Sequence, residues 1–462
     1  MKRSLSGGIP TRRNTELALL VLAVALGMLA YAQVSLATDG RLPHSFWIVG
    51  AGMGLLVLIA HITLRLRAPY ADPILLPAVV LLNLLGLTMI HRLDIADAQR
   101  AVRNGTKPPA LEVYAQLTWT TLAVFLFIAV VFVVRDHRRL QRFTYISMLL
   151  GIGLLLSPLT PGIGATINGA TLWLRVAGFS FQPAELAKVM LTIFFAGYLV
   201  MKRDSLAIVR AKVLGVGIPR GRDLGPLVVI WFASLGTLFF EHDVGIAALF
   251  FGLFVALLYV ATERRGWLVI GFIMFLLGGG LAYAAFGHVA VRFEIWWNPW
   301  AHQATTGYQL VQSLFALASG GLTGAGLGQG YPQLVPFAKS DFITAAIGEE
   351  LGLTGLMAIL VLYAIIVERG LRTAIASRDP FGTLLAAGLS FVTALQVFLV
   401  VGGVTRLIPL TGLTTPFLAA GGSSLIVNWM IIALLLRISD RNRRPQDIAK
   451  TPDESLTQVI RL

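Results

Sequence analysis

The sequence predicts an all-α protein that crosses a membrane many times. Of its 462 residues, 56% are hydrophobic and only 13% are charged, which is the composition of polytopic membrane proteins. Twelve apolar windows are long enough to cross a hydrocarbon core of about 30 Å. Lysine and arginine gather in alternate connections between these windows. The fold expected is therefore a bundle of transmembrane helices.

The predicted spans divide the chain into three parts. Residues 1–72 hold a basic leader and two helices, and 441–462 form a charged tail. Between them, 73–440 form a core of ten helices, with a large outer loop before the antepenultimate helix. The first span lacks a small-residue cleavage site, so we expect a retained anchor. The twelve spans are predicted at 17–36, 46–64, 74–91, 115–134, 143–158, 183–201, 225–240, 244–261, 267–286, 345–367, 381–402 and 415–436.

The basic residues predict the orientation of the helices. If the N-terminus is cytoplasmic, 27 of the 37 lysines and arginines lie in cytoplasmic segments and 9 lie outside. The remaining one, Lys188, lies within a span. Such a bias follows the rule that cytoplasmic loops are rich in positive charge. Both termini are therefore predicted to be cytoplasmic.

The same distribution excludes one class of partner. A net charge of +14 would suit a nucleic-acid-binding protein, but the charges sit in short loops beside the spans. No basic segment is interleaved with aromatic residues that could stack on bases. The absence of cysteine excludes a disulfide framework. Nucleic acid is not expected as a partner.

The outer side carries the longer connections, at 92–114, 159–182, 287–344 and 403–414. In the longest of them, apolar and polar residues from Tyr308 to Ala318 follow the period of an amphipathic helix at the interface. The three tryptophans Trp296, Trp297 and Trp300 suit the level of lipid headgroups. The glycines after this helix lack the strand and the Gly-Lys-Ser/Thr ending of a phosphate-binding loop. We expect the protein to act on its outer side.

The first cluster of polar residues begins at Asp341. Acids near hydrocarbon are costly and usually mark a substrate path or reaction centre. Ser340 or Asp341 could cap the helix that follows, but capping does not explain Glu349 and Glu350, about 12 Å further along. We predict that Asp341 is catalytic. Glu349 is predicted to bind substrate, with a structural role for both glutamates as the alternative.

The second cluster is FQPAELAK at 181–188. Gln182, Glu185 and Lys188 recur every three residues and form one stripe on a helix that begins near Pro183. Two interpretations stay open. Glu185 and Lys188 could form an ion pair that supports the fold, or Lys188 could bind an anion, because a lysine within a membrane span is usually functional. All three are predicted substrate-binding residues.

The third cluster is TRLIPLTGLTTPFLAAGGSS at 405–424. Arg406 is the only charged residue here and is predicted to bind a phosphate or pyrophosphate, with contact to lipid headgroups as the alternative. Ser423 and Ser424 are predicted to bind substrate, or else to join helices. A metal site at Glu241-His242-Asp243 is not favoured, because adjacent helical residues point apart. A divalent cation (Mg or Mn) that bridges a substrate pyrophosphate stays an alternative.

These three strings, in this order, resemble the SEDS family of bacterial shape, elongation, division and sporulation proteins. The resemblance extends over about 73–440, and the two extra N-terminal spans resemble those of actinobacterial members. RRNTEL at 12–17 and GVTRLIPLTG at 403–412 are closer to the RodA (elongation) branch than to the FtsW (division) branch. Departures include Ala419-Ala420 before the glycine pair and EHDVG at 241–245.

The resemblance implies a peptidoglycan glycosyltransferase of the bacterial cytoplasmic membrane. Such an enzyme polymerises lipid II into undecaprenyl-linked glycan on the outer leaflet, beside a class B penicillin-binding transpeptidase. Asp341 would be the base that activates a sugar hydroxyl. Lys188 and Arg406 would stabilise the leaving pyrophosphate, and C1 of the sugar would invert. A lipid II flippase, a division or sporulation polymerase and a silent scaffold are the alternatives.

Overall fold

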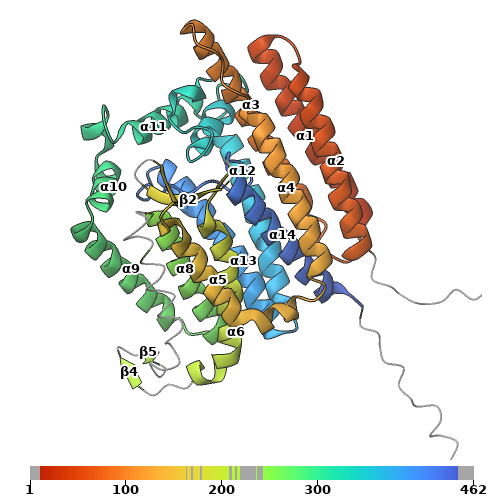
Figure 1. Cartoon of the computed structure of the whole chain (residues 1–462), viewed down its shortest axis with the longest axis vertical. Coiled ribbons are helices and arrows are strands. Elements are labelled where there is room, and N and C mark those ends of the chain that lie inside the picture. Colours follow the sequence, from red (N-terminus) through yellow and green to blue (C-terminus); the bar gives the residue numbers. More distant parts are fainter. Residues whose placement is uncertain are drawn as a thin grey trace, which may run out of the picture.

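The computed structural model describes residues 11–162, 164–167, 170–176, 179–207, 211–213, 216–218, 236 and 243–445. Within these residues, eleven helices are long and apolar enough to cross a membrane. They run roughly side by side in one bundle (Figure 1). Eleven of the twelve predicted spans coincide with them, and the span predicted at 225–240 lies outside the described residues.

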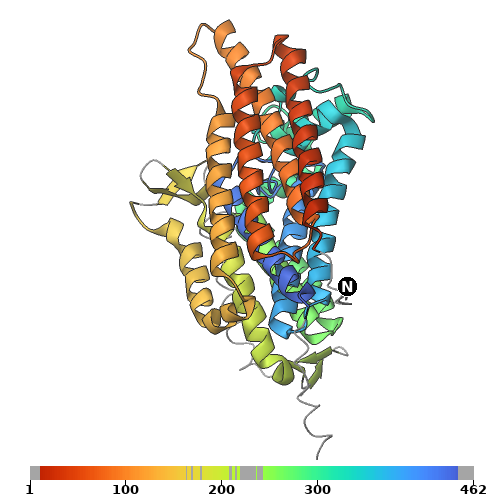
Figure 2. The ribbon, with the colours of Figure 1, turned by 90° about the vertical axis from the view of Figure 1, so that its right-hand side faces the viewer.

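The N-terminal extension forms a helical hairpin against one side of the bundle (Figure 2). The hairpin consists of α1 (Arg13–Asp39) and α2 (His44–Arg67). The core begins after it with α3 (Leu75–Arg103) and α4 (Glu112–Val133). A side chain at Gly27 of α1 would place its Cβ 2.5 Å from Leu84 Cβ of α3. The glycine therefore allows the two helices to approach closely.

The connection at 159–182, predicted as one of the longer outer loops, contains a small sheet. After η1 (His137–Phe143), α5 (Thr144–Leu156) and η2 (Ser157–Leu159) come β1 (Gly164–Ile167), β2 (Ala170–Val176) and β3 (Phe179–Phe181), all antiparallel. Then follow α6 (Pro183–Ala207) and a hairpin of β4 (Ala211–Val213) and β5 (Val216–Ile218). The strands were not predicted; they form because the β-branched and aromatic residues of this connection pair with one another.

The long outer loop is largely helical. After α8 (Val244–Thr262) and α9 (Gly266–Ala285), it contains α10 (Gly287–Trp297), η3 (Pro299–His302), α11 (Tyr308–Gly320) and η4 (Pro332–Leu334). The amphipathic helix predicted at Tyr308–Ala318 is confirmed as α11. In Figure 1, α10 and α11 extend over one end of the bundle from the outer end of α9.

Three long helices complete the core: α12 (Ile343–Ile375), α13 (Pro380–Val404) and α14 (Gly422–Arg443). Several predicted boundaries were wrong, and α12, for example, continues to Ile375 instead of 367. The helix α3 continues to Arg103, well beyond 91, and α14 starts at Gly422 instead of 415. Helices α3, α6 and α14 are the most buried of the eleven, whereas α9 is mostly exposed. Of the second and third clusters, Glu185, Lys188, Ser423 and Ser424 thus lie on two of the most buried helices, α6 and α14.

The two ends of the described chain meet at one end of the bundle (Figure 1). Tyr70 N donates to Asp440 Oδ1 over 2.9 Å, and Arg443 Nη2 lies 2.6 Å from Asp72 Oδ2. These bonds join the link between α2 and α3 to the end of α14. Both ends therefore lie on the same side of the bundle, opposite α10 and α11.

Candidate functional site

Asp341 lies in the turn between η4 and α12, on the side of the bundle that carries α10 and α11. The residue that caps α12 is Phe342, and no side chain bonds to the first turn of the helix. The expectation that Ser340 or Asp341 caps this helix was therefore wrong. Asp341 as a whole residue is half-buried, and its carboxyl group is not used to start α12.

The surroundings of Asp341 make it a weak acid. Burial is the main cause that raises its pKa to about 7, and the negative charge of Asp243 acts in the same direction. A hydrogen bond with Ser340 and the positive charge of Arg292 act against this shift. A carboxyl group that titrates near neutral pH can accept a proton from a hydroxyl group and release it again.

Asp243 and Arg292 were not predicted as site residues. Asp243 is buried, and its Oδ1 accepts a hydrogen bond from Ile246 N over 2.8 Å at the start of α8. Burial raises its pKa. Arg292 of α10 donates to Leu410 O over 2.9 Å. The sequence does contain a signal for each of them. Asp243 is an acid at the edge of a predicted span, and Arg292 is one of only two lysine or arginine residues in the loop at 287–344.

The second predicted cluster forms a polar centre between α6, α13 and α14. Lys188 Nζ lies 2.5 Å from Glu185 Oε2, 2.7 Å from Gln396 Oε1 and 3.4 Å from Asn428 Oδ1. Lys188 is only 1% exposed. Its three donors face protein acceptors, as the ion-pair interpretation predicts. Binding of substrate by Glu185 or Lys188 stays a prediction.

The start of α14 joins this centre to the start of α6. Ser423 Oγ accepts a hydrogen bond from Gln182 N over 3.0 Å. Ser424 Oγ accepts one from Asn428 Nδ2 over 3.1 Å. Gln182, Ser423 and Ser424 are all buried. Ser423 therefore connects α14 to the start of α6, which was the alternative to substrate binding, whereas the bond of Ser424 stays within α14.

Two further links bring the first cluster close to the other two. Ala420 N donates to Lys339 O over 2.7 Å, which fixes the turn that carries Asp341 beside the start of α14. The charge of Glu185 contributes to the raised pKa of Asp243, and that of Asp243 to the raised pKa of Asp341. A row of acids thus leads from the turn at Asp341 to Lys188.

Arg406 lies apart from this row and is bound to α10. Its Nε donates to Trp296 O over 2.8 Å and its Nη2 to Trp297 O over 2.7 Å. In return, Trp296 Nε1 donates to Arg406 O over 3.1 Å. Arg406 has a positive φ of 61°, which is strained for a residue with a side chain. Arg406 therefore holds the end of α10. To contact a pyrophosphate as predicted, its guanidinium group would have to donate to the phosphate as well as to these two carbonyl oxygens.

The two glutamates of α12 hold the glycine-rich loop. Glu349 Oε1 accepts from Tyr331 N over 2.8 Å, and Glu350 Oε2 accepts from Gly328 N over 3.0 Å. Arg92 pairs with Glu350 at 2.8 Å and donates to Gly330 O. At Gly352 the helix is interrupted by a φ of 67°. These contacts favour the structural alternative for both glutamates; substrate binding by Glu349 stays a prediction.

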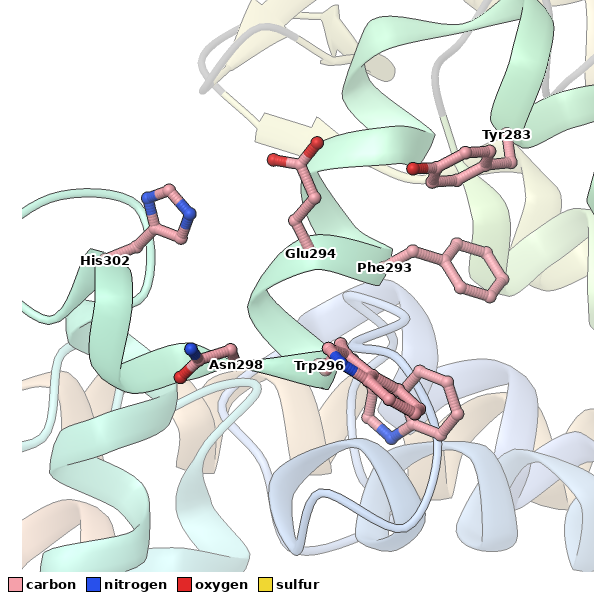
Figure 3. A pocket seen from close by; sticks show the side chains of 7 residues that line it. Tyr283, Phe293, Glu294, Trp296, Asn298 and His302 are labelled. Carbon is pink, nitrogen blue, oxygen red and sulfur yellow. The ribbon is translucent and has the colours of Figure 1, made fainter.

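A cavity of about 360 Å³ lies at the C-terminal end of α9 and along α10. Figure 3 shows its lining: the rings of Tyr283, Phe293 and Trp296 lie on one side, and Glu294, Asn298 and His302 on the other. Phe293, which lines the cavity, directly follows Arg292 in α10. The cavity offers apolar ring faces and hydrogen-bonding groups on the same helix as Arg292.

In the part of the chain that the structure describes, no group of three or more acids and histidines could hold a metal ion. Glu241 and His242 lie outside the described residues, so the weakly favoured metal site at 241–243 is not tested. Its third member, Asp243, is used as a helix cap.

Comparison with known proteins agrees with this architecture. The sequence profile of the cell cycle protein family of FtsW, RodA and SpoVE matches residues 73–444. The chain belongs to this family. It is 49% identical to the peptidoglycan glycosyltransferase RodA of Mycobacterium tuberculosis (strain H37Rv), over 95% of this chain and 92% of that protein. The RodA of Mycobacterium leprae is 46% identical over the same shares.

A solved structure shows the same fold. One chain of a peptidoglycan synthase complex superposes with a TM-score of 0.63 and 23% sequence identity, covering 81% of this chain and 99% of that chain. Together with the eleven apolar helices, family membership identifies a multi-pass membrane protein. The prediction of an all-α SEDS-type bundle is confirmed.

Proposed function

We propose that this chain polymerises lipid II into glycan strands, with Asp341 as the general base. Relatives that cover nearly the whole chain are named peptidoglycan glycosyltransferase RodA, and the chain is an enzyme of this kind. Their name also supports a role in cell elongation and shape over division. The observation that carries the proposal is the Asp341 carboxyl group, which makes no cap bond and has a pKa of about 7.

The reaction needs a base and a group that accepts negative charge. A sugar hydroxyl of the incoming lipid II attacks C1 of the lipid-linked glycan, and Asp341 accepts the hydroxyl proton. The bond from C1 to the undecaprenyl pyrophosphate breaks, and its electron pair leaves with the phosphate oxygen. A single displacement without a covalent intermediate inverts C1.

The cations near Asp341 suit the leaving group to different degrees. Arg292 already acts on the pKa of Asp341 and is only half-buried, so it is well placed to meet a pyrophosphate. Lys188 is enclosed by protein acceptors and Arg406 is bound to α10. We therefore assign the direct role to Arg292, and Lys188 and Arg406 hold the polar centre and α10 in position. Sugar units would contact the cavity beside Trp296.

The decisive experiment supplies lipid II to the purified chain in detergent, where the two sides of a membrane do not exist. Asp341→Asn is expected to lower polymerisation by at least about a hundredfold without lowering the unfolding temperature. Asp39→Asn, the same change at an exposed carboxyl group at the end of α1, is the matched control. Full activity of Asp341→Asn would remove the base from the mechanism, and a wild-type chain without polymer would favour a flippase.

Partners and orientation follow from the same function. A class B penicillin-binding transpeptidase is the proposed partner, because a structural relative was solved in a synthase complex that coordinates polymerization and crosslinking. We further propose that both termini face the cytoplasm, since the two ends of the described chain share one side of the bundle and the basic residues concentrate there. Cysteines introduced at Asp39 and Arg139 should react with an impermeant thiol reagent from outside and from inside, respectively.

A divalent cation is proposed only as a partner of the substrate pyrophosphate. Oxygen ligands from phosphate are those that Mg²⁺ prefers. Chelation with EDTA should then lower polymerisation, and added Mg²⁺ should restore it. Unchanged activity in EDTA would show that the cation is not needed.

A further inference from the structure

A second cavity, of about 350 Å³, lies at the opposite end of the bundle from Asp341. We call it the arginine pocket. Four segments that are far apart in the sequence build it: the start of α1, the link from α2 to α3, the turn from α12 to α13, and the end of α14. Its lining consists of Arg12, Tyr70, Ala71, Arg378, Asn442, Arg443 and Arg444.

The walls of the pocket are firmly held. Arg13, next to Arg12, is buried and binds Glu16 and the carbonyl oxygen of Ala71. Asp440 accepts from Tyr70 N over 2.9 Å, and Asn442 Nδ2 donates to Thr373 O over 2.9 Å. The four segments therefore do not need to rearrange for the cavity to exist.

The pocket has more positive charge than its acids neutralise. Arg443 pairs with Asp72 at 2.6 Å and Arg444 with Asp440 at 2.8 Å. Both aspartates are buried. Among the described residues, neither Arg12 nor Arg378 forms a hydrogen bond or ion pair through its side chain. Two guanidinium groups with a fork of donors are thus available for an anion.

We infer that the arginine pocket binds the phosphate headgroup of an anionic membrane lipid. The apolar residues close to the lining residues along the chain are exposed: Leu17 is 38%, Leu66 71% and Ile375 84% exposed. In a membrane protein, such side chains face the acyl chains. A headgroup between Arg12 and Arg378 would therefore have its tails beside apolar surface, whereas a soluble anion would gain nothing from it.

The N-terminal extension makes the pocket specific to chains of this kind. The family match begins at residue 73, so Arg12, Tyr70 and Ala71 belong to the part before it. One wall of the pocket is thus absent from a chain that consists of the family core alone. Bound lipid would fasten the extension to the turn from α12 to α13 and to α14.

The test titrates fluorescent cardiolipin into the full chain in detergent and measures its affinity. The double variant Arg12→Gln/Arg378→Gln is expected to bind about tenfold more weakly. The matched control Arg139→Gln/Arg142→Gln removes two exposed arginines on the same side of the bundle and is expected to stay within about twofold. Neither double variant should change the unfolding temperature.

Each other outcome overturns the inference. Equal losses of cardiolipin affinity in both double variants would show that the lipid is attracted by the overall positive charge of this side and not by the pocket. Displacement of cardiolipin by millimolar glycerol 3-phosphate would identify a site for soluble phosphates instead of lipids. If the double variant proves unstable, the single variants Arg12→Gln and Arg378→Gln are compared with Arg139→Gln. Each is expected to bind about threefold more weakly, and full binding by both would refute the pocket.

Discussion

The two ends of the bundle use charge in opposite ways. At the end that carries Asp341, burial and the charge of Asp243 raise the pKa of Asp341, and Arg292, whose charge acts against this shift, also donates to Leu410 O. At the other end, two arginines surround each buried acid: Asp72 with Arg443 and Arg369, and Asp440 with Arg444 and Arg437. Burial beside a second acid raises the pKa of Asp341 and makes it a base that titrates near neutral pH. An excess of arginine produces a place for an anion.

Removal of a charge should lower the unfolding free energy most in the polar centre between α6, α13 and α14. Lys188→Met would leave Glu185 buried without its cation, and we expect a loss of about 3–5 kcal/mol of unfolding free energy. Unfolding by SDS titration measures it. Lys107→Met, at an exposed lysine, should change stability by less than about 0.5 kcal/mol. Equal stability of the two variants would contradict the ion-pair role.

Loss of a buried charge at the arginine-rich end should lower the unfolding free energy by less than Lys188→Met does. Asp72→Asn removes the charge that Arg443 and Arg369 share, but the side-chain oxygen can still accept from Ile74 N. Because the arginines are partly exposed to water, we expect a loss of about 2 kcal/mol in the same titration. A loss as large as that of Lys188→Met would show that both ends depend equally on buried charge.

The pH dependence of polymerisation tests whether the charges of Asp243 and Arg292 set the pKa of Asp341. A base must be deprotonated, so polymerisation should rise with pH through the pKa of Asp341, about 7. Asp243→Asn removes a negative charge that raises this pKa, so the rise should move to lower pH, and asparagine can still cap α8. Arg292→Gln removes a positive charge that lowers it, so the rise should move to higher pH.

The measurement is the polymerisation rate of each variant across the pH range, with lipid II in excess. Because the two carboxyl groups interact, the midpoint belongs to the pair. A midpoint that stays in place in both variants would show that neither charge acts on the base.

The smallest effect is expected where charge is well exposed. Arg372 pairs with Glu368 one turn earlier on α12, and both side chains are exposed. Arg372→Ala should change the unfolding free energy by less than about 0.5 kcal/mol. A loss near that of Asp72→Asn would mean that burial is not what separates the two kinds of ion pair.

The sequence was most informative about the helices. Apolar windows predicted eleven helices that the structure contains, because a membrane span must satisfy its backbone bonds within itself. The period of Tyr308–Ala318 predicted α11 for the same local reason. The sheet of β1, β2 and β3 was missed, since strands depend on partners elsewhere in the chain. The continuation of α3 to Arg103 was missed because its last turns are polar.

For the site, the residue types could be predicted from the sequence, but their partners could not. It singled out Asp341, Gln182, Lys188 and Ser423 as polar groups in apolar surroundings. It could not show that Lys188 faces Gln396 and Asn428, or that Arg406 holds α10, because these contacts join helices far apart in the chain. Asp243 and Arg292 entered the site only once α8 and α10 were placed beside the turn at Asp341.

The sequence by itself therefore determined that this chain is a membrane bundle of a known family, and which of its acids stand out. Hydrophobic period and charge distribution are local properties and can be read along the chain. Only the tertiary structure decided which acid keeps an uncommitted carboxyl group, which cation reaches it, and where arginines exceed their acids. Charge interactions depend on distance and burial, and both are set by how the helices pack.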